Sequence, residues 1–281
     1  MIDQSLSPSS RSVGMAHSVG MLHFFGLTYL LSWLIWIPLD LSHFGIGPFS
    51  IPEATSNLIR LFGVLMPAVA ALILTYQAGR GVAVKNLLSR LKIWRVGWNW
   101  WLAAALGQPV LILFSALLYN AVWENPPVSL IPIGAVSALL VNVFFLLIAT
   151  LGEEIGWRGV ALPGLQSTNT PLISSLILCL LWGVWHIPFW LLMDTFTTFG
   201  FSYIVLNFFL GIPLTVYITW VFNHTRASLL LVVAFHLTFN IMNTALLPVT
   251  LNRGAFCLLI VFEWIIGLLI IRHLGPAAEA G

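Results

Sequence analysis

Two adjacent carboxylates and an arginine lie within six residues of a very apolar chain, in the segment LGEEIGWRG at 151–159. Glu154 and Arg158 are four residues apart, so on a helix they are neighbours on one face. Glu153 then points about 100° away from that pair. Because a charge inside a membrane segment costs about 3 kcal/mol, each of these groups needs a physical reason. We expect Arg158 to neutralise Glu154 and Glu153 to be the working carboxylate. A surface salt bridge is the alternative for the pair, but it does not explain Glu153.

Two further polar motifs lie downstream in apolar segments. His186 follows Trp182 by four residues in WGVWH, and Asn240 follows His236 by four residues in HLTFN. Taken alone, each histidine could be a packed side chain or part of an interhelical hydrogen bond. Because such groups occur in three of the predicted spans, we expect them to form one polar site.

These residue types suit the attack of water on an amide. A carboxylate in apolar surroundings, as expected for Glu153, is a stronger base than one in water. A neutral imidazole such as His186 can hold and polarise a water molecule, while His236 and Asn240 can donate hydrogen bonds to an oxyanion. No Ser or Cys belongs to the cluster, so we expect no covalent nucleophile.

The three motifs together resemble the CPBP family, the CAAX proteases and bacteriocin-processing enzymes also called the ABI family, which includes type II CAAX prenyl endopeptidases. Its signature is E-E-x-x-x-R, then F-x-x-x-H, then H-x-x-x-N or D, on separate transmembrane helices. This chain has EEIGWR at 153–158, WGVWH at 182–186 and HLTFN at 236–240, in the same order. Trp182 departs from the usual Phe, which preserves an aromatic wall but leaves pocket shape and substrate preference open.

The resemblance implies an intramembrane endopeptidase that cleaves peptide bonds near the cytoplasmic side of the membrane. The catalytic residues it implies are Glu153, His186, His236 and Asn240. In the glutamate mechanism proposed for the family, Glu153 and His186 activate water, and His236 and Asn240 form the oxyanion hole. Glu154, Arg158 and Trp182 then have structural or orienting roles. The implied partners are membrane lipid and a substrate: a prenylated C-terminus, a leader peptide or another membrane protein.

We expect no metal or other cofactor, because the H-E-x-x-H ligand spacing of the well-known zinc proteases is absent. The family is also widely labelled as metalloproteases, so zinc is the alternative. One Glu and two His could then supply three ligands and leave an open position for water.

The amino-acid composition indicates the environment in which this site lies. Hydrophobic residues make up 59% of the chain and charged residues 7%, against roughly 25% charged residues in soluble domains, so the surface must face lipid. The net charge of +2 is small and scattered, which argues against nucleic-acid binding. A span needs about 20 apolar residues, and eight segments qualify. They are 20–39, 61–77, 100–122, 131–152, 171–193, 202–222, 228–247 and 255–271.

The predicted fold is therefore an all-α, polytopic membrane protein with about eight transmembrane helices. We expect an N-terminal tail at 1–19, one membrane domain at 20–273 with the protease core at about 131–247, and a C-terminal tail at 274–281. Nine Lys and Arg residues fall on one side of the spans and two on the other, which accounts for all eleven. The positive-inside rule then places both termini in the cytoplasm of a cell. The segment 81–95 is either an interfacial basic helix or a basic loop.

The depth of the motifs sets a further condition. Glu153 follows the predicted fourth span, whereas His186 lies fifteen residues into the fifth, roughly 22 Å along a helix. For these groups to meet, the fourth span must continue past Glu153. The fifth must begin below the membrane surface, with Thr170 as its cap and Pro171 in its first turn.

Two other function classes remain open at this stage. An inactive scaffold or immunity protein would keep the fold and lose motif residues. A proton-coupled transporter could use Glu153, Glu154 and Glu263, but it predicts broken helices in matched halves of the chain.

Overall fold

The computed structural model of this chain describes residues 20–48, 50–123, 128–129, 136–246 and 249–276, and its regular elements are helices. The longer ones are α2 (Met21–His43), α3 (Glu53–Ser89), α4 (Trp98–Val122), α5 (Val136–Gly156), α7 (Pro171–Leu191), α9 (Phe201–His224), α10 (Leu229–Asn240) and α11 (Arg253–Ile270). Short helices are α6 (Leu162–Gln166) and α8 (Asp194–Phe199). The predicted all-α, polytopic fold is confirmed. The predicted tail 1–19 lies outside the described residues.

Seven of the helices in the described ranges are long and apolar enough to cross a membrane. The eighth predicted span, 228–247, is shorter as a regular helix than expected. It consists of the twelve-residue α10 followed by a π-helical turn, Ile241–Leu246. A hydropathy pattern does not distinguish these two helical forms, because both place apolar side chains around the same axis.

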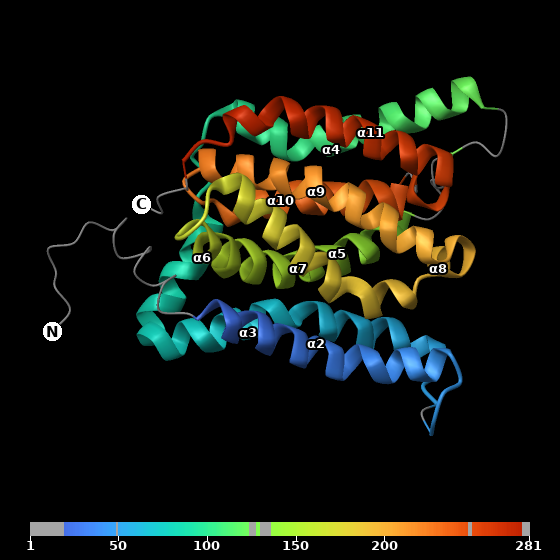
Figure 1. The fold of residues 1–281 in the computed structure, drawn as a ribbon, viewed down its shortest axis with the longest axis horizontal. Helices are drawn as coiled ribbons and strands as arrows, with labels where there is room; N and C mark the ends of the chain where they lie inside the picture. The colour runs from blue at the N-terminus through green and yellow to red at the C-terminus, as the bar shows by residue number, and fades with distance from the viewer. Residues whose placement is uncertain (1–19, 49, 124–127, 130–135, 247–248, 277–281) are drawn as a thin grey trace, which may run out of the picture.

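The helices lie in layers, with the three motif-bearing helices near the middle (Figure 1). α2 and α3 pair on one side of the molecule, α4 and α11 pair on the other, and α5, α7, α9 and α10 lie between them. Apolar side chains such as Leu34, Leu106 and Leu268 are exposed on the outer helices. This arrangement gives an apolar exterior and leaves the polar motif residues enclosed.

Two glycines determine how α5 packs. A Cβ atom on Gly156 would lie 2.5 Å from the Cβ of Pro67, and one on Gly152 would lie 2.7 Å from Leu65. Only a residue without a side chain permits this close approach of α5 to α3. Because Gly152 and Gly156 define the face toward α3, the acidic pair between them is directed toward the other central helices.

The fourth span continues past the acidic pair, as the depth argument requires. α5 runs into a π-helical turn, Trp157–Ala161, and then into α6, so the apolar helical segment extends from 140 to 166. The fifth span begins where predicted, with Pro171 in its first turn and Thr170 Oγ1 accepting a hydrogen bond from the Ile173 N–H at 3.3 Å. The continuation of the fourth span and the predicted start of the fifth are confirmed, and their depth in a membrane stays a prediction.

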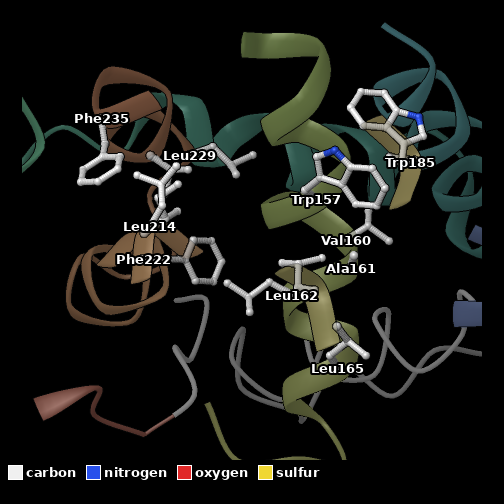
Figure 2. Packing of buried hydrophobic residues seen from close by; sticks show 14 of the residues in the cluster. Trp157, Val160, Ala161, Leu162, Leu165, Trp185, Leu214, Phe222, Leu229 and Phe235 are labelled. Atoms are coloured by element: carbon white, nitrogen blue, oxygen red, sulfur yellow. The ribbon is translucent and has the colours of Figure 1, made fainter. Parts of the chain in front are cut away.

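A hydrophobic core fixes the helical segment that follows the acidic pair (Figure 2). Trp157 is fully buried and makes an edge contact with Trp185 at 5.4 Å between ring centroids. Leu162 belongs to the same core, together with Phe222 and Leu229 from α9 and α10. Because core side chains pack at high density, this part of the chain has little room to shift.

α3 continues beyond residue 77, where the predicted span ends. Gly79 and Arg80 depart from helical geometry, with φ of 56° at Arg80, and the chain then resumes as a helix to Ser89 and a 3₁₀ turn, Arg90–Lys92. The loop alternative for the basic segment is therefore wrong up to Lys92. Its position on a membrane surface remains a prediction.

We expect Ser89→Cys to react with a membrane-impermeant thiol reagent only from the cytoplasmic side, because most basic residues lie at that end of the spans. Ser89 is exposed, and so is Ser50, which lies before α3 at the opposite end and gives a matched control. A Cys257→Ser background removes the exposed native thiol, and Cys179 is buried. Labelling of Ser89→Cys from outside intact cells would reverse the predicted orientation.

Candidate active site

Glu154 is the centre of a buried charge cluster that joins three elements. Its Oε1 atom accepts a hydrogen bond from Arg158 Nη1 at 2.8 Å and another from His236 Nδ1 at 2.7 Å. Glu154 is fully buried, and the other two residues are exposed by 2% and 5%. The predicted pairing of Glu154 with Arg158 is confirmed. The contact to His236 also fixes α10 against α5.

Glu153 belongs to a different network, although it is adjacent in sequence. Its Oε2 atom accepts a hydrogen bond from Trp182 Nε1 at 2.8 Å and lies 3.8 Å from His186 Nε2. Glu153 and His186 are exposed by 5% and 6%. The helical twist thus separates the two carboxylates: one contacts α10 and the other contacts α7.

The His186 ring is held on several sides. Its Nδ1 atom lies 2.9 Å from the Trp182 carbonyl oxygen, which can only accept, so Nδ1 carries the proton of this hydrogen bond. The ring stacks on Trp190 at 5.3 Å and meets the Trp185 ring edge-on at 4.4 Å. In the neutral ring, Nε2 is therefore an acceptor that faces the Glu153 carboxylate.

Two acceptors 3.8 Å apart, Glu153 Oε2 and His186 Nε2, can share one donor molecule. A water at roughly 2.8 Å from each atom can direct one of its protons to each. That orientation leaves the lone pairs of the water pointing away from both residues. The geometry thus suits a polarised water that attacks an electrophile on its open side.

Asn240 meets α5 one helical turn from the Glu154 cluster. Its Nδ2 atom donates a hydrogen bond to Thr150 Oγ1 at 3.4 Å. Thr150 precedes Glu154 by four residues, just as His236 precedes Asn240, so the two pairs form successive rungs between the helices. Thr150 is fully buried and was not among the predicted site residues. The sequence signal that could have identified Thr150 is its four-residue spacing from Glu154, which places both residues on the same face of a helix.

The partner of His236 restricts how it can stabilise an oxyanion. When Nδ1–H donates to Glu154, the Nε2 atom of a neutral ring is an acceptor. Only the doubly protonated ring has a second donor at Nε2. The role predicted for His236 therefore requires an imidazolium, for which the Glu154 carboxylate is a suitable counter-ion.

The zinc alternative requires three protein ligands that face one point. Across the described ranges, no three His, Cys, Asp or Glu side chains are grouped so that they could hold a metal ion. Glu153 and His186 lie side by side. His236 donates a hydrogen bond from Nδ1 to Glu154, which leaves Nε2 of a neutral ring able to act as a ligand.

An apolar cavity of about 520 Å³ adjoins the site. Its lining comes from α3, α5 and α7 and includes Leu61, Val64, Phe145, Leu146, Ala149 and Phe189. Ala149 is one helical turn before Glu153, and Phe189 is almost one turn after His186, so the cavity approaches both groups. Arg60 and Asn142 add polar groups to an otherwise apolar wall.

Glu263 stands apart from these networks. It is fully buried in α11, and its carboxylate faces the fully buried side chain of Gln108 in α4. No described contact joins Glu263 to the motif residues.

We expect Trp182→Phe to lower the turnover rate about thirtyfold. The change keeps an aromatic ring but removes the indole N–H that holds the Glu153 carboxylate at 2.8 Å, and a hydrogen bond to a charged group contributes about 2 kcal/mol. Steady-state kinetics should show the effect mainly in kcat, because the lost contact orients the base. Unchanged kcat would mean that the indole serves packing alone.

Comparisons with known proteins agree with the predicted resemblance. Residues 135–242, which contain all three motifs, match the family described as type II CAAX prenyl endopeptidase Rce1-like. Over 236 residues the chain is 27% identical to a CAAX prenyl protease 2 of Methanococcus maripaludis, an alignment that covers 81% of this chain and 84% of that protein. The resemblance predicted from the motifs is confirmed.

Proposed function

We propose that this chain is an intramembrane protease that hydrolyses peptide bonds with a water activated by Glu153 and His186, because its motif-bearing core resembles the Rce1-like type II CAAX prenyl endopeptidases. The observation that carries the mechanism is the 3.8 Å separation of Glu153 Oε2 and His186 Nε2, which suits a shared water. Their near-complete burial strengthens any electrostatic interaction between them and a reacting group.

The proposed reaction balances without a covalent intermediate. Glu153 takes a proton from the water as its oxygen attacks the peptide carbonyl carbon, while His186 holds the water in place. The carbonyl oxygen becomes an oxyanion that Asn240 and a doubly protonated His236 stabilise by hydrogen bonds. Glu153 then gives its proton to the leaving amine as the C–N bond breaks. Glu154 and Arg158 hold His236 in position.

The proposed substrate has an apolar group beside the bond that is cleaved at the cytoplasmic side of the membrane. The apolar cavity next to Glu153 supports this substrate class, because a mainly apolar lining favours an apolar ligand. The related archaeal protein carries the name CAAX prenyl protease 2. We therefore propose CAAX-type processing of a lipidated C-terminus first, with leader-peptide processing as the second candidate.

A substrate comparison tests this proposal. The purified full-length chain in liposomes would be incubated with a prenylated CAAX peptide, its unprenylated counterpart and a leader peptide, and the products identified by mass spectrometry. We expect cleavage of the prenylated peptide and much slower cleavage of the unprenylated one. Cleavage of the leader peptide alone would instead favour leader-peptide processing.

We expect proteolysis to continue in the presence of a strong chelator, because the proposed base and donors are all protein side chains. The measurement is the initial rate of peptide cleavage before and after chelation, with and without added zinc. Activity that disappears with the chelator and returns with zinc would overturn the metal-free mechanism and make His186 and His236 candidate ligands.

A further inference from the structure

The segment from Arg80 to Arg95, here called the cationic segment, forms a surface with both charged and apolar groups. Arg80, Lys85, Lys92 and Arg95 are exposed, and the segment contains no acidic residue. Large apolar side chains are exposed beside these cations: Val82 by 70%, Trp94 by 57% and Trp98 by 74%. Such a combination fits the headgroup region of a membrane better than either water or the hydrocarbon core.

The cationic segment contacts the element that carries Arg158. Arg90 Nη1 donates a hydrogen bond to the Gly159 carbonyl oxygen at 3.0 Å. Leu87 packs so closely there that a Cβ atom on Gly159 would lie 2.9 Å from its Cδ1. Gly159 follows Arg158 in the π-helical turn Trp157–Ala161. A shift of the segment would therefore act directly on the backbone beside Arg158.

The same segment also contacts the start of the helix that carries His236. Ser228 Oγ donates a hydrogen bond to the Ile93 carbonyl oxygen at 2.6 Å and accepts one from the Leu231 N–H as the cap of α10. Arg226 donates a hydrogen bond to the Arg95 carbonyl oxygen. Thus Arg158 and His236, the two side chains that bind Glu154, both belong to elements that are hydrogen-bonded to the cationic segment.

We propose that the cationic segment binds anionic phospholipid headgroups, and that this binding sets the activity of the site through the Arg90–Gly159 contact. Charge complementarity supports the choice of ligand, since clustered Lys and Arg beside exposed Trp attract anionic leaflets. Arg80 directs the segment away from the axis of α3, because its positive φ of 56° breaks the helix there. The effect on activity rests on the proposed function, whereas the lipid binding does not.

Lipid binding is tested first, without reference to catalysis. The full-length chain in neutral detergent would be titrated with phosphatidylglycerol and with phosphatidylcholine, and bound lipids counted by native mass spectrometry. We expect Lys85→Gln/Lys92→Gln/Arg95→Gln to weaken phosphatidylglycerol binding about fivefold or more and to leave phosphatidylcholine binding unchanged. Arg272→Gln removes an exposed cation outside the segment and should have little effect. Equal phosphatidylglycerol binding by the wild type and the triple variant would overturn the assigned surface.

The link to the site is tested with vesicles of phosphatidylcholine alone and with added phosphatidylglycerol. We expect the wild type to cleave peptide about fivefold faster in the anionic vesicles, a typical coupling between two sites, and the triple variant to show no difference. Arg90→Gln should still bind phosphatidylglycerol but lose the stimulation. Retained stimulation in either variant would overturn the coupling.

A catalytically inactive variant distinguishes failure of this inference from failure of the proposed function. Glu153→Gln should keep the preference for phosphatidylglycerol in mass spectrometry while it fails to cleave peptide in either vesicle. If the wild type cleaves peptide in neither vesicle, the proposed function and its regulation both fail, and the binding titration alone decides the lipid surface. If the wild type cleaves equally in both, the regulation alone fails.

Discussion

Glu153→Gln is expected to lower the rate of peptide hydrolysis about a hundred- to ten-thousandfold, the usual contribution of a positioned general base. Glutamine has nearly the same size as glutamate, and its side-chain oxygen can still accept the hydrogen bond that Trp182 Nε1 makes at 2.8 Å. The packing around the site should therefore survive. What is lost is the ability to take a proton from the water shared with His186.

The measurement is single-turnover cleavage of a fluorogenic peptide by the purified protein in liposomes. Gel filtration and thermal unfolding should show that the variant folds like the wild type. Glu263→Gln is a matched control, since Glu263 is also fully buried but contacts no motif residue in the described structure. Its rate should stay close to that of the wild type. Full activity of Glu153→Gln would overturn the proposed mechanism, because a group other than Glu153 would then have to activate the water.

Motif spacing could predict those parts of the site that lie within one helix. The Glu154–Arg158 pair follows from a four-residue separation alone, and so does the contact of Trp182 with the His186 ring at 4.1 Å. Contacts between helices depend on their relative rotation and register, which no local pattern contains. The Glu154–His236 and Thr150–Asn240 hydrogen bonds are of this second kind.

The spans show a similar division between what hydropathy can and cannot predict. It located each apolar segment, but it ended the fourth one at residue 152, because the polar sequence EEIGWR follows. The helix nevertheless continues to Gln166. Backbone hydrogen bonds within a helix do not depend on side-chain polarity. Glu153 and Glu154 find partners on neighbouring helices, and Arg158 pairs with Glu154 in its own helical segment. The polar residues that form the site therefore made the span look shorter in the hydropathy pattern than it is in the structure.

Arg158→Met is expected to destabilise the protein by about 3–5 kcal/mol, because it removes one partner of a buried ion pair and leaves the other without compensation. Arg158 is 2% exposed and Glu154 is fully buried, so water cannot replace the lost guanidinium without opening the bundle. Of the described contacts to the Glu154 carboxylate, the one from His236 Nδ1 would remain. We expect the midpoint of thermal unfolding to fall by roughly 10 °C.

The double variant Glu154→Gln/Arg158→Met distinguishes loss of charge balance from loss of packing. Gln at position 154 carries no charge, yet its carbonyl oxygen can still accept the hydrogen bond from His236 Nδ1. If the uncompensated carboxylate causes the instability, the double variant should unfold at a higher temperature than Arg158→Met. Differential scanning fluorimetry in detergent gives both midpoints, and Arg226→Met serves as the control at an exposed arginine. A double variant less stable than Arg158→Met would show instead that packing of the two side chains dominates. Activity should not return with stability, because a neutral residue at 154 no longer provides the counter-ion that a doubly protonated His236 requires.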